Sequence, residues 1–112
     1  MPMSTTIARG NVGFEAVLQV TISPPTTIAA NTTIESTYTV PGVYLGDFLE
    51  INKPSHLTGL SIGNIRASAT NTIAIQWVNS TTTTITSVPN ELYLIAVTRF
   101  DSLPQNPPAA IA

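Results

Sequence analysis

The sequence predicts an all-β domain: a β-sandwich or jelly roll of about seven to eight antiparallel strands, with extended N- and C-terminal arms. Short runs of β-branched and aromatic residues recur along the chain, and Pro, Gly or Asn closes each run. The strong helix formers Ala, Leu, Glu and Lys nowhere cluster with a period of 3.6 residues. Turn signals recur roughly every 8–12 residues, a spacing typical of sandwiches and barrels.

Three regions divide the chain. Residues 1–14 are predicted to form an N-terminal arm, because apolar residues are sparse there and Gly10 and Gly13 interrupt them. Residues 15–100 carry the strand signals and are predicted to form the sandwich. Residues 101–112 are rich in proline, which cannot join a ladder, so we expect an extended tail with polyproline-type stiffness.

The first predicted strand covers residues 15–23. Its apolar side chains Leu18, Val20 and Ile22 stand two residues apart, so they share one face of the strand. Pro24-Pro25 ends this strand, because proline has no amide hydrogen to donate to a neighbouring strand.

The second predicted strand, residues 32–40, has the most regular alternation in the chain. One of its faces carries Ile34, Ser36, Tyr38 and Val40. Pro41-Gly42 then predicts a turn, since proline sets φ at the first central position and glycine accepts a positive φ at the second. The third predicted strand covers residues 48–52 and is ended by Pro54.

Three further strand signals follow a loop at residues 55–59. The fourth predicted strand is 60–67, and Thr70-Asn71 predicts the turn after it. The fifth is 72–78, and its predicted inward-facing residues are Ile73, Ile75 and Trp77. The Thr-rich segment 81–85 is predicted to be a sixth, edge-like strand.

The last predicted strand, residues 91–100, follows a turn at Pro89-Asn90. Residues 92–97 are apolar on both faces of this strand. Such a strand lies in the middle of its sheet, or a partner covers its outer face.

The charge content argues against a nucleic-acid partner. Charged residues make up 9% of the chain and the net charge is −2, whereas about 25% is usual. Nucleic-acid binding needs clustered cations, but the basic residues are scattered: Arg9, Lys53, Arg66 and Arg99. So few charges give little protection against association, which suggests that other subunits cover the surface. A free-standing Thr-rich domain with an uncharged surface is an equally open interpretation.

Cysteine and long apolar segments are both absent from the sequence. Without cysteine the chain has no disulfides, thiol catalysis or thiolate metal sites. No apolar run approaches the roughly 18 residues of a membrane span, so we expect no membrane partner. The N-terminus lacks a basic start and an apolar core, so we expect no signal peptide and synthesis in a cytoplasm.

The titratable residues predict no catalytic site, no metal and no cofactor. The one histidine, His56, lies in a loop and is predicted to be solvated. Asp47 and Glu50 are three positions apart on a strand, so they face opposite sides and do not form an acid–base pair. We expect Asp47 to bond backbone amides at its turn. No G-x-S-x-G nucleophile motif occurs, and the chain is predicted not to be an enzyme.

The aromatic residues divide into predicted core residues and one predicted surface residue. Tyr44 stands beside a turn and is expected to be exposed, whereas packing in the core is expected for Tyr38, Trp77 and Tyr93. Glycosylation sequons begin at Asn31 and Asn79, and we interpret both as chance matches in a Thr-rich chain.

Three segments in the middle of the chain resemble small virion proteins of tailed phages. They are TVPGVYLGDF (39–48), GLSI (59–62) and ASATNTIAIQWVN (67–79). In that group a turn of the form V-x-G-hydrophobic-x-x-G-D precedes a strand, and a strand ending in Asn follows. The resemblance covers about residues 31–99. It implies a β-sandwich, commonly trimeric, with no catalytic residues, found in capsid decoration (cement) proteins and tail-fibre modules.

The resemblance and the low charge together predict a capsid decoration protein at the surface of the virion, made in the host cytoplasm. The expected partners are copies of the chain, as a homotrimer, and the major capsid protein. The alternative is a tail-fibre or tip module that binds a host receptor or polysaccharide through Tyr44 and nearby loops. The candidate assembly contacts lie on the last strand and the two arms: Ile7, Val12, Phe14, Tyr93, Ile95, Leu103 and Ile111.

Overall fold

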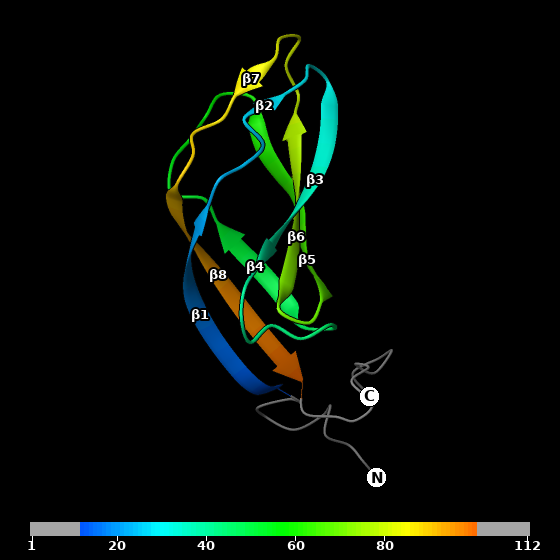
Figure 1. The fold of residues 1–112 in the computed structure, drawn as a ribbon, viewed down its shortest axis with the longest axis vertical. Helices are drawn as coiled ribbons and strands as arrows, with labels where there is room; N and C mark the ends of the chain where they lie inside the picture. Colours follow the sequence, from blue (N-terminus) through cyan, green and yellow to red (C-terminus); the bar gives the residue numbers. More distant parts are fainter. Residues whose placement is uncertain (1–11, 101–112) are drawn as a thin grey trace.

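Eight strands make up the fold in the computed structural model, which describes residues 12–100 (Figure 1). In chain order they are β1 (Val12–Ile22), β2 (Thr27–Ile28), β3 (Thr32–Thr39), β4 (Phe48–Asn52), β5 (Leu60–Ala69), β6 (Thr72–Asn79), β7 (Ile85–Thr86) and β8 (Glu91–Phe100). No helix occurs within the described residues, so the predicted all-β class is confirmed.

The strands form two three-stranded antiparallel sheets and one short pair. One sheet has the order β1-β8-β4, and the other has the order β3-β6-β5. The pair β2-β7 lies at one end of the molecule (Figure 1). The two larger sheets enclose the core as the layers of a sandwich.

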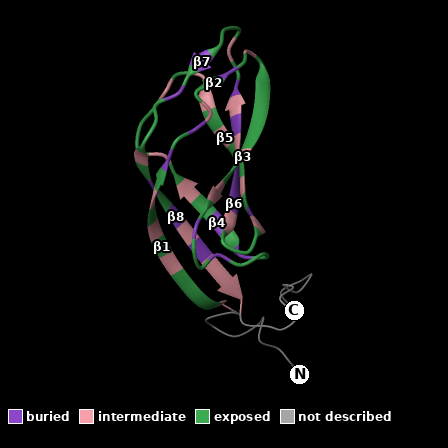
Figure 2. Cartoon of the chain, in the orientation of Figure 1, coloured by how far each residue is buried: buried purple, intermediate pink, exposed green. Residues whose placement is uncertain are grey.

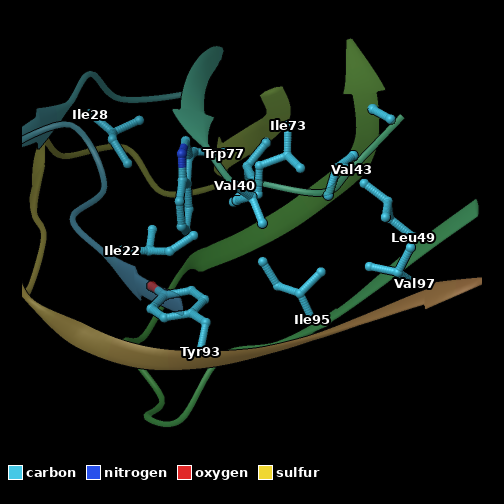
Figure 3. Close-up of a cluster of buried hydrophobic side chains, with 12 residues drawn as sticks. Ile22, Ile28, Val40, Val43, Leu49, Ile73, Trp77, Tyr93, Ile95 and Val97 are labelled. Atoms are coloured by element: carbon cyan, nitrogen blue, oxygen red, sulfur yellow. The ribbon is translucent and has the colours of Figure 1, made fainter. Parts of the chain in front are cut away.

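The core lies between the two central strands, β6 and β8. The predicted inward residues Ile73, Ile75 and Trp77 of β6 have no exposed surface, which confirms their placement. Trp77 meets Tyr93 of β8 edge to face, with ring centroids 6.2 Å apart and an interplanar angle of 84° (Figure 3). Ile95 lies beside this pair and continues the core along β8.

A chain of hydrogen bonds joins the two sheets at the level of Trp77. The Trp77 Nε1–H donates to Ser36 Oγ at 3.0 Å, and Ser36 Oγ lies 3.2 Å from Tyr38 Oη. Tyr38 in turn donates to the backbone oxygen of Ser23 at 3.1 Å. Because the Tyr38 hydrogen is used on Ser23, the Ser36 hydroxyl donates to Tyr38. Ser36 therefore satisfies two aromatic polar groups, which explains a serine on the inner face of β3.

The predicted turns occur where the sequence placed them. Gly42 follows Pro41 with φ of 95°, and the Val43 amide donates to the Val40 carbonyl at 3.3 Å. Asn71 and Asn90 both have positive φ, at 59° and 57°. Asparagine tolerates this left-handed conformation better than other residues with a Cβ, so these two turns were readable from residue type.

The strand boundary at the N-terminal end differs from the prediction. β1 begins at Val12, three residues before the predicted start at Glu15. Val12 lies opposite Phe100 and Phe14 opposite Arg99, with an irregularity between them that accommodates Gly13. A bulge lets the strand continue past a glycine that appeared to end it. The rest of the predicted arm and the tail at 101–112 lie outside the described residues.

The Thr-rich segment also differs from the prediction. The expected strand at 81–85 is replaced by a loop followed by the two-residue β7, which pairs with the unpredicted β2. The buried side chain of Asn79 organises this loop: Nδ2 donates to the carbonyls of Ile28 and Thr83, each at 2.9 Å. Its Oδ1 accepts from the amide and hydroxyl of Thr81 at 2.9 and 2.7 Å.

Candidate assembly surface

β8 is the central strand of its sheet, as its two apolar faces predicted. Its side chains alternate between the core and the outer surface of the sheet. Tyr93 and Ile95 point into the core and have 0% exposure. They were predicted as assembly contacts, and this placement corrects that prediction, because a side chain without exposed surface cannot touch a partner. The outward residues of the strand are their neighbours Leu92 and Leu94, at 55% and 42% exposure.

The outward residues of β8 continue onto both neighbouring strands. Val17 of β1 is the Cα partner of Ala96, and Phe48 of β4 is the partner of Thr98. Val17 and Phe48 are 68% and 63% exposed. We call this set the apolar stripe: Val17, Phe48, Leu92, Leu94 and Ala96.

Polar residues border the apolar stripe on both sides. On β1 they are Glu15, Gln19 and Thr21, and on β4 they are Glu50 and Asn52. An apolar centre with a polar border is the usual composition of a protein–protein interface. A stripe of large exposed apolar side chains is typical of an interaction surface.

The outer face of the other sheet is polar. Arg66 of β5 donates to both carboxylate oxygens of Glu35 on β3, at 2.9 and 2.8 Å. This pair spans the central strand β6, where Ala74, the Cα partner of Arg66, has no exposed surface. The hydrogen bonds from Arg66 lower the pKa of Glu35. The sandwich therefore has one polar outer face and one outer face that carries the apolar stripe.

A second cluster closes the end of the sandwich where β1 begins and β8 ends. Arg99 donates to both oxygens of Asp47, at 2.8 and 2.7 Å, and to the carbonyl of Gly42 at 2.9 Å. The Tyr44 amide donates to Asp47 at 2.9 Å, which confirms the turn role predicted for that aspartate. The guanidinium carbon of Arg99 lies 4.9 Å from the ring centroid of Phe14 and 4.0 Å from that of Tyr44.

The electrostatics of Asp47 follow from its position in this cluster. Its side chain has no exposed surface. Burial alone would raise the pKa of Asp47, but the hydrogen bonds from Arg99 and from the Tyr44 amide outweigh burial and lower it. Asp47 is therefore a structural anion held by Arg99.

The remaining predicted contact residues are only partly described. Phe14 is half-exposed on β1 with Arg99 over its ring, and Val12 is partly buried at the start of the strand. The other three, Ile7, Leu103 and Ile111, lie outside the described residues. Tyr44 is half-exposed, as predicted for the surface aromatic.

The other sites considered in the sequence are structural or isolated. Asn79 is buried and its side-chain amide is hydrogen-bonded within the protein, so the asparagine of this sequon has a structural role. His56 is exposed in its loop. Within residues 12–100 no three His, Cys, Asp or Glu side chains gather as metal ligands would. In the same residues no helix is long and apolar enough to cross a membrane.

Comparison of the chain with protein-family models, curated proteins and solved structures finds no match. The fold and surface define a β-sandwich with an apolar stripe on one outer face.

Proposed function

We propose that the chain is a structural protein of a tailed-phage virion, a capsid decoration protein that binds the major capsid protein on the assembled head. It acts by binding and performs no catalysis. Two findings support the proposal: the sequence resemblance over about residues 31–99, and the difference between the two outer faces of the sandwich. The second carries it, because the apolar stripe leaves Val17, Phe48, Leu92 and Leu94 exposed on one face only.

The size of the apolar stripe sets what it contributes to attachment. Full burial of one such side chain is worth about 1.5–3 kcal/mol, and these four side chains are roughly half-exposed, so their burial is worth on the order of 4 kcal/mol. This gain is no larger than the cost of association itself, which is about 4–15 kcal/mol in lost translational and rotational freedom. Stable attachment therefore needs further contacts, and the terminal segments with Ile7, Leu103 and Ile111 are the proposed source.

Cosedimentation with assembled heads prepared without the chain tests the proposal. The Leu92→Ser/Leu94→Ser variant changes only outward side chains of β8, and we expect it to lose most of its occupancy on heads. Its matched control is Thr33→Ser/Thr37→Ser on the polar face, which we expect to bind like the unmodified chain. Equal occupancy of the two variants would count against attachment through the apolar stripe, and no binding by the unmodified chain would count against decoration.

A tail-fibre or tip module remains the second candidate, because Tyr44 and Leu45 are exposed side by side in a loop. Arg99 occupies one face of the Tyr44 ring, so the opposite face is the one that a sugar would stack on. Binding to host polysaccharide that is lost in Tyr44→Ala would favour this candidate. Retention of head binding in the same variant would favour decoration.

A further inference from the structure

The outer edge of β1 is long, regular and unpaired among residues 12–100. β1 pairs only with β8, and the pairing runs without interruption from Phe14 to Ile22. Figure 2 shows intermediate and exposed positions alternating along this strand. Its outer edge therefore presents backbone amides and carbonyls that no other described strand satisfies.

β1 lacks the features that normally protect a strand edge. Edge strands are usually short, bulged, or supplied with Pro or Lys. Residues 14–22 contain no Pro, Lys or Gly, and their only charge is Glu15. β5 is an edge strand of the other sheet, and its pairing is interrupted twice, between Ile62 and Asn64 and between Ala67 and Ala69. Two bulges thus interrupt β5, whereas the one irregularity of β1 lies at its end, between Val12 and Phe14. The other edge of that sheet, β3, also pairs without interruption, so variants on β3 serve as a control.

We propose that a second copy of this chain pairs its own β1 with this edge, antiparallel, with Leu18 opposite the partner's Leu18. This register pairs all nine residues from Phe14 to Ile22, because Leu18 is the middle of the regular segment. It places Glu15 opposite the partner's Thr21, so the two carboxylates do not face each other.

The same register matches side chains on both faces of the joined strands. On the outer face Val17 lies opposite the partner's Gln19, and on the inner face Ala16 lies opposite the partner's Val20. Alternation is preserved across the joint, so apolar residues stay on the core side of both strands.

The pairing produces one six-stranded sheet with the order β4-β8-β1-β1-β8-β4. Its twofold axis is perpendicular to the sheet, so the apolar stripes of the two copies face the same side. With strands about 4.8 Å apart and about 30 Å long, three strands present about 400 Å² and six about 800 Å². The larger value is about the area that each partner contributes to a standard protein–protein interface. The occupant of the edge itself is argued from the self-complementary register of β1, which a second copy satisfies.

The strand pairing does not rest on the virion proposal. If both hold, the enlarged outer face offers more area for attachment to the capsid. Pairing of identical edges closes after two copies. It therefore competes with the trimer that the sequence resemblance implies. The mass of the purified protein in solution distinguishes the dimer, at twice 11.8 kDa, from the trimer, at three times 11.8 kDa.

Light scattering on the purified full chain, over a range of concentrations, tests the pairing. We expect a dimer. The Val17→Glu/Gln19→Glu variant places each new carboxylate opposite another, and its dimer should dissociate at least about tenfold more readily. Val17→Lys/Gln19→Lys should do the same. An equal mixture of the two variants should form a dimer again, because Glu then lies opposite Lys. Both positions are exposed, and an unchanged circular-dichroism spectrum verifies the fold.

Two control variants distinguish β1 from other surfaces. Thr37→Glu/Thr39→Glu alters exposed positions on β3, an edge of the opposite sheet, and should leave the dimer intact. Leu92→Ser/Leu94→Ser alters the face but not the edge and should also leave it intact. A single-copy or three-copy mass, a loss of the dimer in either control, or failure of the mixture to restore it would overturn the pairing.

Discussion

Arg99 and Asp47 form a bidentate ion pair between the end of β8 and the turn that precedes β4, and the two residues are 52 positions apart in the sequence. The carboxylate has no exposed surface, and the guanidinium also contacts the rings of Phe14 and Tyr44. One residue therefore connects β1, β8 and the 41–47 loop at the end of the sandwich where the described chain begins and ends.

Breaking this pair is expected to be costly. Asp47→Asn removes the charge that compensates Arg99 but preserves the shape of the side chain. We expect the free energy of unfolding in urea to fall by about 2–4 kcal/mol, since a mostly buried cation loses its partner. The double variant Asp47→Asn/Arg99→Met should lose less than the sum of the two single variants. Additive losses would show that the two residues act independently.

The same pair predicts how stability depends on pH. The folded-state pKa of Asp47 lies below its ordinary value, so the unfolded chain binds more protons. Its contribution is therefore fully present above about pH 5, begins to fall near the ordinary value of about 4, and is lost as pH drops through the folded pKa. Urea unfolding between pH 7 and 2 measures this.

The Asp47→Asn variant should have a flatter stability curve below pH 5 than the unmodified chain. Glu35→Gln is the control, because Glu35 also has a lowered pKa but lies on the surface, where its ion pair with Arg66 contributes little. If the acid-dependent loss follows Glu35 and not Asp47, the assignment is wrong.

Ser36 is expected to matter more than an ordinary strand serine. Ser36→Ala leaves the Trp77 Nε1–H without its acceptor and removes the donor to Tyr38, both in the partly buried core region. We expect the free energy of unfolding to fall by about 1–3 kcal/mol. The fluorescence of the single tryptophan measures the unfolding. Ser61→Ala, on the exposed face of β5, should change stability by less than about 0.5 kcal/mol. Similar losses in the two variants would exclude a special role for Ser36.

Local signals explain which parts of the fold the sequence could predict. The alternation of apolar residues from Ile73 to Trp77 predicted a strand with one buried face. Gly42, Asn71 and Asn90 predicted turns, because glycine and asparagine accept positive φ. These features depend on residues close together in the chain. They located the strands and the turns without knowledge of the sheet order.

The remaining features depend on distant partners. β2 and β7 are two residues each, and they exist as strands because Thr27 and Ile28 meet Thr86 and Ile85. No short pattern marks such a pair. In β8 both alternating sets are apolar, so periodicity could not show which set faces the core.

Consequently Tyr93 and Ile95 were predicted as assembly contacts although they belong to the set that faces the core. The sequence also carries no signal for the contact between Arg99 and Asp47, since neither residue type nor spacing indicates a partner 52 positions away. A buried carboxylate at a turn is recognisable only after the fold brings a cation to it.

The terminal segments provide the last test, and the observed start of β1 sets where to cut. Deleting residues 1–14 would remove three residues of β1, including the Phe14 ring under Arg99. A loss of attachment in that variant could then result from a loss of folding. Deleting residues 1–11, with an initiator Met retained, or residues 101–112 avoids this. Because the core cluster extends from Ile22 to Val97, we expect both truncated chains to melt within a few degrees of the full chain.

Attachment should respond differently from folding. Because burial of the apolar stripe alone does not exceed the cost of association, loss of the terminal contacts should reduce occupancy on heads by at least about tenfold. Cosedimentation of each truncated chain with heads, beside the full chain, measures this. If both truncated chains occupy heads like the full chain, Ile7, Leu103 and Ile111 make no contact. The attachment energy would then come entirely from residues 12–100.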